Sequence, residues 1–143
     1  MKNMRKIVGI ILLLTVILNL SAAVSAAGEI TPYYNNALSA NTTASVSSSG
    51  LLTITNRYQG IDGVTTRVEL ATYLEKKVSG VWTRVDIGTT DDTWYYWSNK
   101  VSYSGTRPFQ LPAKGTYKVT TIFTFLGLGG DPDQLTRTYQ VTW

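Results

Sequence analysis

Apolar and polar residues alternate along most of the chain after residue 40. The alternating segments are rich in Thr, Val, Ile, Tyr and Trp, the residue types that favour a pleated, half-buried strand. Beyond the first 26 residues, no segment shows the spacing of an amphipathic helix. The pattern predicts about seven strands, over residues 42–48, 51–58, 65–76, 81–87, 93–103, 115–126 and 134–142.

Short segments of Gly, Ser and Asp separate these strands. They read SSSG at 47–50, YQGIDG at 58–63, VSG at 78–80 and GLGGDPD at 127–133. Gly readily adopts positive φ, and Ser and Asp side chains cap turns. Since no connection is long enough for the crossover helix of a parallel sheet, we expect an all-β fold, a single antiparallel β-sandwich over residues 41–143.

The segment LPAKGTYKVTTIF narrows the fold class. Leu111 and Gly115 precede Tyr117, and Val119 and Phe123 follow it on the same strand face. This arrangement resembles the tyrosine corner of immunoglobulin-like and fibronectin type III sandwiches, in which the tyrosine hydroxyl bonds back to the main chain. The paired cysteines and the buried Trp between them, which mark true immunoglobulin domains, are missing, so the resemblance implies the broader immunoglobulin-like class.

The first 26 residues have the composition of a secretory signal peptide. Lys2, Arg5 and Lys6 precede an apolar run at 7–20 and then a tail of small residues. The run is shorter than the roughly 20 apolar residues of a membrane span. Small residues allow cleavage after Ala26 or Ala27, and we favour Ala26. The sequence thus predicts a signal peptide at 1–26, an N-terminal arm at 27–40 and a secreted, extracellular protein that meets the membrane only during export.

Cleavage at this point lowers the net charge. The full chain has 13 basic and 9 acidic residues, and three of the basic ones leave with the signal peptide, giving a mature net charge of +1. The remaining basic residues are scattered, so no nucleic-acid partner is expected. The chain has no cysteine, so an exported domain of this size depends on its apolar core rather than on disulfides.

Two further segments resemble uncharacterised families of small secreted proteins from Gram-positive bacteria. They are EITPYYNN at 29–36 and YLEKKVSGVWTRV at 73–85. The resemblance implies a bacterial source and supports the fold, and it carries no activity.

Enzyme chemistry has few candidate residues. The chain has neither His nor Cys, which excludes Ser-His and Cys-His nucleophiles and most zinc sites. Asp91 and Asp92 are adjacent, as in an ordinary turn. Asp131 and Asp133 flank Pro132 in a glycine-rich loop, which leaves open either a calcium site or a plain turn. We expect a non-enzymatic protein without a cofactor.

Four consecutive aromatic residues at 94–97 are the strongest functional candidates. In one continuous strand over 93–103, the series Tyr95, Trp97 and Val101 faces the core. Trp94, Tyr96 and Lys100 then lie outside. The two rings either pack across the strands against Thr, Arg or Lys side chains, or form with Lys100 a candidate ligand platform. Exposed rings of this kind stack on sugars or enter a lipid interface.

These features suggest a secreted surface-recognition module at the cell envelope or on extracellular carbohydrate. A membrane-active, bacteriocin-like factor and a partner or inhibitor of another secreted protein are the alternatives.

Overall fold

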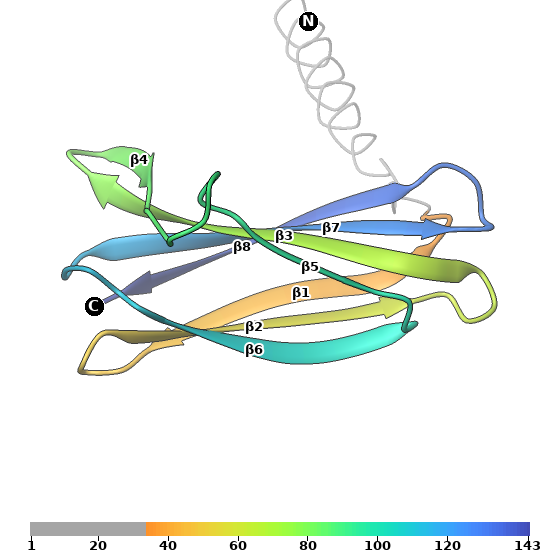
Figure 1. The fold of residues 1–143 in the computed structure, drawn as a ribbon, viewed down its shortest axis with the longest axis horizontal. Coiled ribbons are helices and arrows are strands. Elements are labelled where there is room, and N and C mark those ends of the chain that lie inside the picture. Colours follow the sequence, from red (N-terminus) through yellow and green to blue (C-terminus); the bar gives the residue numbers. More distant parts are fainter. Residues whose placement is uncertain (1–33) are drawn as a thin grey trace, which may run out of the picture. The chain divides into compact units, whose positions relative to one another are not determined.

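A computed structural model describes residues 34–143, which contain eight strands and no helix (Figure 1). The strands are β1 (Ala37–Val46), β2 (Leu51–Gly60), β3 (Thr65–Val78), β4 (Val81–Arg84), β5 (Trp94–Ser98), β6 (Ser102–Gln110), β7 (Thr116–Gly127) and β8 (Asp133–Thr142). Over this range there is accordingly no helix long and apolar enough to cross a membrane. The predicted signal peptide lies outside the described residues.

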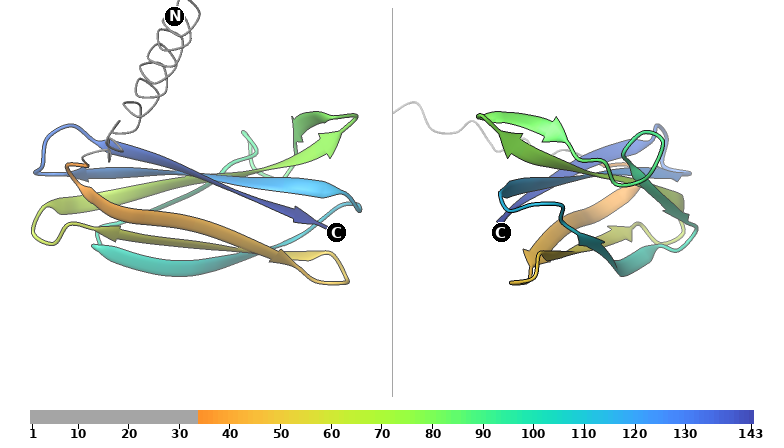
Figure 2. Two further views of the ribbon diagram at one scale, coloured as in Figure 1. Left: turned by 180° about the vertical axis from the view of Figure 1, so that it is seen from behind. Right: turned by 60° about the vertical axis from the view of Figure 1, so that its left-hand side comes forward.

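The strands form two antiparallel sheets that pack face to face (Figures 1 and 2). The smaller sheet has the order β1-β2-β6. The larger has the order β4-β3-β7-β8, and β5 also pairs with β3, beside β4. The predicted all-β antiparallel sandwich is therefore confirmed.

The strand order is immunoglobulin-like. If the strands are lettered by the usual scheme, β1, β2 and β6 correspond to A, B and E, and β4, β3, β7 and β8 correspond to C′, C, F and G. β5 has the chain position of strand D, but it pairs with β3 instead of lying beside β6. This change of sheet brings the aromatic segment onto the larger sheet.

The tyrosine corner is present where the sequence predicts it. Tyr117 is fully buried near the start of β7, and its hydroxyl donates to the carbonyl oxygen of Ala113. Val119, Phe123 and Phe125 lie on the same face of β7 and are also fully buried. This hydrogen bond thus holds the loop between β6 and β7, which connects the two sheets, against the start of β7.

The prediction of one continuous strand over residues 93–103 is wrong. The chain forms β5, turns at residues 99–101 and enters the other sheet as β6. Sequence reasoning missed most of β6 because Gly105 and Pro108 disfavour a strand. β6 lies at a sheet edge, where a proline is tolerated, and the Tyr103 side chain covers Gly105.

The sandwich begins earlier than residue 41. β1 starts at Ala37, inside the segment assigned to the N-terminal arm. The main-chain N–H groups of Asn36 and Ala37 both donate to the carboxylate of Asp133. The Asn36 side chain also donates to the Asp131 carbonyl (3.0 Å) and accepts from Gly129 N–H (3.1 Å). These bonds attach the start of β1 to the β7–β8 turn.

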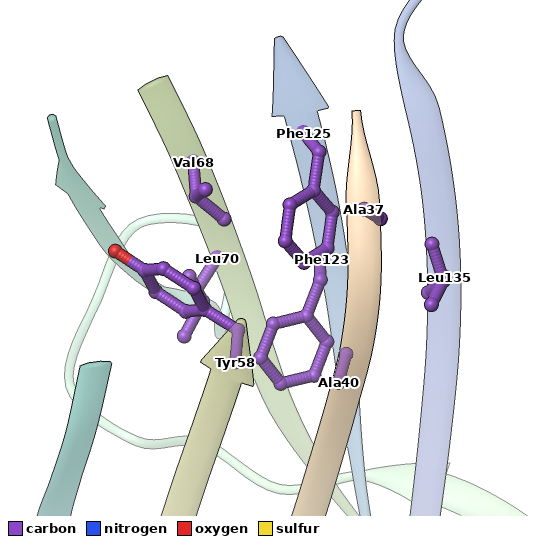
Figure 3. Packing of buried hydrophobic residues seen from close by; sticks show 8 residues of the cluster. All are labelled: Ala37, Ala40, Tyr58, Val68, Leu70, Phe123, Phe125 and Leu135. Carbon is purple, nitrogen blue, oxygen red and sulfur yellow. The ribbon is translucent and has the colours of Figure 1, made fainter. Parts of the chain in front are cut away.

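The core consists of two apolar clusters with a polar layer between them. Figure 3 shows the first cluster, which is Ala37, Ala40, Tyr58, Val68, Leu70, Phe123, Phe125 and Leu135. The second is Leu52, Ile54, Leu74, Val85, Leu111, Tyr117 and Val119. Both clusters draw their residues from 34–143, which form one compact unit, so this part of the chain has a core of its own and is expected to fold alone.

The polar layer joins the two sheets through Asn56 of β2. Its amide oxygen accepts from Thr42 (2.8 Å) and Thr121 (3.1 Å), and its amide nitrogen donates to Thr72 (3.1 Å). Among the described residues, no buried side-chain polar atom lacks a partner. A satisfied buried network of this kind fixes the alignment of the sheets, since any shift leaves polar groups unpaired.

Candidate functional site

The pairing of β5 with β3 decides which of its aromatic side chains face outward. Residues directly opposite one another in an antiparallel pair lie on the same face. Trp94 is opposite Thr72 and Tyr96 is opposite Leu70, and both of these β3 residues are buried. The inward series of β5 is therefore Trp94, Tyr96 and Ser98.

The prediction that Trp94 and Tyr96 face outward and Tyr95 and Trp97 face the core is thus wrong. The Trp94 ring packs edge-to-face against Phe109 of β6, with ring centroids 5.4 Å apart. The Tyr96 ring stacks on Tyr103 at 4.6 Å and is 36% exposed. Lys100 is exposed in the β5–β6 turn, where its carbonyl oxygen accepts from the Tyr58 hydroxyl (3.1 Å). The structure does not bring Trp94, Tyr96 and Lys100 together on an outer platform.

The physical reason is the turn after β5. The predicted core series extended the alternation from Tyr95 through Val101 to Tyr103, which requires one unbroken strand. The chain leaves the larger sheet after Ser98, so Tyr103 belongs to the other sheet and gives no information about the faces of β5.

The outward residues of β5 are Tyr95 and Trp97, which are 67% and 59% exposed. The Tyr95 hydroxyl donates to the Asp91 carboxylate (2.6 Å). The Arg67 guanidinium lies over the Trp97 ring, 4.7 Å from its centroid. Each ring is held by one neighbour and still exposes most of its surface.

A shallow groove of about 240 Å³ runs beside these two rings on the outer face of the larger sheet. Ala71 of β3 and Ile122 of β7 are paired across the strands and provide a small apolar floor. Besides Tyr95 and Trp97, the groove is lined by Arg67, Glu69 and Thr124. One surface thus combines two exposed rings, an apolar floor and side chains that donate and accept hydrogen bonds.

The charges in the groove are balanced. Arg67 and Glu69 form an ion pair at 2.8 Å, with both side chains nearly half exposed. The pKa of Tyr95 is raised above its usual value, chiefly because its hydroxyl donates to Asp91. The Tyr95 hydroxyl is therefore protonated and uncharged at neutral pH.

Farther along the same face, charged side chains cover the aromatic rings. The Arg84 guanidinium lies 3.3 Å from the ring centroid of Tyr73. The ammonium groups of Lys118 and Lys77 lie 4.6 and 5.7 Å from the Trp82 ring. Tyr73 and Trp82 are half-buried, so these contacts stabilise the sheet and leave little ring surface for a ligand.

A second hollow lies between the sheets, where Trp94, Tyr96 and Tyr103 surround Asn56. Its volume is about 50 Å³, which holds a few water molecules at most. It is too small for an organic ligand.

The acidic pairs act as local anchors. Asp133 is buried and accepts from two main-chain N–H groups, while Asp131 is exposed. Asp91 and Asp92 lie in the turn before β5, as expected, and Asp92 accepts from Ile87 N–H (3.3 Å). Across residues 34–143, no group of three or more acidic side chains is placed to hold a metal ion.

Sequence reasoning missed Arg67, Glu69 and Ala71 as site residues. Their signal was present, because alternation in β3 puts the odd-numbered residues on the face opposite Val68 and Leu70. Their role becomes visible only when β5 is known to pair with β3, a contact between residues more than 20 positions apart.

Comparisons with known proteins give little further information. No protein-family model matches the chain, and no curated protein matches it. One similar solved structure is the CARDB domain of a protein from Pyrococcus furiosus, determined in complex with di-metal ions. It is 12% identical, the match covers 78% of this chain and 96% of that one, and the TM-score is 0.43. This likeness is too weak to transfer a ligand or an activity to this chain.

Proposed function

We propose that this chain is a secreted, non-enzymatic recognition module that binds carbohydrate at the cell envelope or outside the cell. The binding surface is the groove on the outer face of β3, β5 and β7. The observation that carries the proposal is the pair of exposed rings, Tyr95 and Trp97, held side by side along a shallow groove.

The groove has the chemistry that a sugar ring requires. A pyranose has a face of C–H groups and an edge of hydroxyl groups. The two rings of β5 and the floor of Ala71 and Ile122 suit the apolar face. Glu69 accepts hydrogen bonds from hydroxyl groups and Arg67 donates to them. A few polar groups beside an apolar surface are the usual composition of a small-ligand site.

The charge balance favours a neutral carbohydrate. The Arg67–Glu69 ion pair leaves no excess charge among the groove residues. An anionic sugar would have to break this ion pair to form its own with Arg67, so it would gain little binding energy. We therefore expect binding that varies little with salt, because screening acts mainly on net charge between partners.

The shallow shape of the groove fits recognition better than catalysis. Its floor is the outer face of β3 and β7, and the groove is open to solvent. The sequence adds the predicted signal peptide, which would bring the domain to envelope and extracellular glycans, and the lack of His and Cys. Together these features support a binding role outside the cell.

The test is retention of the domain, residues 34–143, on peptidoglycan and on chitin. We expect the parent to be retained and the Tyr95→Ala/Trp97→Ala variant to bind at least about tenfold more weakly, since exposed aromatic anchors dominate small interfaces. Soluble neutral oligosaccharides of N-acetylglucosamine should compete with retention.

Tyr139→Ala is the matched control, because Tyr139 of β8 is 41% exposed and lies outside the groove. It should bind like the parent. The proposal fails if neither material retains the parent, or if the double variant is retained equally well.

A further inference from the structure

The β3–β4 hairpin exposes two valines at its tip. Val78 and Val81 are paired across the turn and are 50% and 66% exposed. The turn residues Ser79 and Gly80 have φ of 50° and 86°, the left-handed conformation that closes a tight two-residue hairpin. The tip is thus a well-defined apolar protrusion, and it rises from one end of the sandwich in Figures 1 and 2.

Basic residues surround this tip. Half of the ten Lys and Arg residues in 34–143 lie on the hairpin or beside it: Lys76, Lys77, Arg84, Lys114 and Lys118. Four acidic residues are nearby. Asp91 and Asp92 lie in the turn before β5, where the Asp92 carbonyl oxygen accepts from the Arg84 guanidinium (3.3 Å). Glu75 is bound to Lys118 at 2.7 Å, and Asp86 accepts from Gly88 N–H at 2.8 Å. Lys77, Arg84 and Lys114 are exposed, and the five basic and four acidic residues leave this end of the molecule with a net charge of +1.

A mixed apolar and charged surface lies beneath the hairpin. An open hollow there is lined by Val78, Val85 and Pro112 together with the polar and charged residues Lys76, Thr83, Arg84 and Asp86. Pro112 belongs to the loop before β7 and is exposed. Val78 of the hairpin and Pro112 of this loop therefore line the same hollow, among charged side chains.

We propose that this end of the domain docks on an anionic lipid bilayer. The valines of the tip would enter the boundary between headgroups and acyl chains, while the lysines and Arg84 contact the anionic headgroups. Lysine stems lie along apolar surface while their ammonium groups stay in the polar layer. A narrow protruding tip enters a soft lipid boundary more readily than it builds the broad contact of a stable protein interface.

The bilayer site is independent of the carbohydrate groove. The groove is built around Glu69, Ala71 and the β5 rings, and the hairpin tip lies beyond Glu75 along β3. Either proposal can fail without the other.

The test is cosedimentation of residues 34–143 with vesicles. We expect binding to phosphatidylcholine vesicles that contain phosphatidylglycerol, weak binding to pure phosphatidylcholine, and loss of binding at high salt. Val78→Ser/Val81→Ser should weaken binding about tenfold or more. Lys77→Gln/Lys114→Gln should weaken it by roughly fivefold per basic residue removed.

Two variants serve as controls. Leu128→Ser changes an apolar residue that is 80% exposed, in the β7–β8 turn at the other end of the sandwich. Lys100→Gln removes a positive charge distant from the hairpin. Both should bind vesicles like the parent, as should Tyr95→Ala/Trp97→Ala.

The proposal is overturned if the parent ignores anionic vesicles or binds both vesicle types equally. Equal loss of binding in Val78→Ser/Val81→Ser and Leu128→Ser also overturns it. Binding to a soluble polyanion without binding to vesicles would assign the basic end to another kind of partner, and the bilayer proposal would be rejected.

Discussion

At the scale of single residues, Tyr117 stabilises the fold through one side-chain hydrogen bond. Its ring is fully buried, and its hydroxyl donates to the Ala113 carbonyl in the loop before β7. Phenylalanine fits the same space but leaves this carbonyl without its donor.

We therefore expect Tyr117→Phe to lower the free energy of unfolding by about 1–2 kcal/mol. Urea denaturation of parent and variant measures the change. Tyr139→Phe, at an exposed tyrosine of β8, should stay within about 0.5 kcal/mol of the parent. A Tyr117→Phe variant as stable as the parent would show that the corner bond contributes nothing.

Tyr103 gives a prediction about how the free energy of unfolding depends on pH. Burial raises its pKa above the ordinary 10.0, and the neighbouring Tyr96 raises it further. The folded protein therefore keeps a proton that the unfolded chain has lost. The associated stability is complete below pH 10.0 and decreases as the pH rises from there through the folded-state pKa.

Removing the hydroxyl should weaken this dependence. We expect Tyr103→Phe to lose less stability than the parent above pH 10.0, relative to each protein's value at neutral pH. Denaturation curves at neutral and alkaline pH provide the comparison. Parallel losses in both proteins would show that Tyr103 does not contribute.

At the scale of strands, Asp133 connects the first strand to the last. Its carboxylate accepts from the N–H groups of Asn36 and Ala37. Asp133→Ala leaves two buried donors unpaired and should destabilise the domain by about 2–4 kcal/mol. Thermal or urea unfolding would measure this loss.

Asp131→Ala is the matched control, since Asp131 is exposed and offers only its main-chain carbonyl to Asn36. It should change stability by less than about 0.5 kcal/mol. Because Asp133 is already engaged, we also expect neither calcium nor a chelator to shift the parent's melting temperature. A calcium-dependent rise would instead indicate a metal site in this loop.

The strands also show which parts of the structure the sequence determines locally. Alternation identified the positions of β2, β3, β7 and β8 closely, because each has one buried face and follows a turn or loop that contains Gly. The tyrosine corner was recognisable from Tyr117 and the residues before it.

The candidate site was harder to predict because it depends on pairing. The sequence singled out the aromatic segment, but the outward pair follows from the contact of β5 with Leu70 and Thr72 of β3. The turn at 99–101 has neither Gly nor Pro to mark it. From alternation alone, β5 and the start of β6 are therefore predicted as one strand, although they belong to different sheets. This error assigned the inner and outer faces of β5 the wrong way round.

At the scale of the whole molecule, the polar and aromatic features fall into separate regions. The core and its Asn56 layer hold the sheets together. The outer face of the larger sheet carries the Tyr95–Trp97 groove, and one end carries the basic hairpin. In the proposed arrangement, the domain contacts a bilayer through the β3–β4 hairpin while the groove stays open to a glycan.

The four tryptophans allow a direct measurement of the central proposal. Trp82, Trp94, Trp97 and Trp143 all lie in the described part of the chain, and each gives one indole N–H signal in an NMR spectrum of residues 34–143. The measurement is a titration with a soluble N-acetylglucosamine oligosaccharide. We predict that the Trp97 signal shifts with saturation, while the signals of Trp94 and Trp143 stay in place. A shift centred on Trp94 or Trp143, or no shift at any indole, would contradict the assignment of the groove as the binding surface.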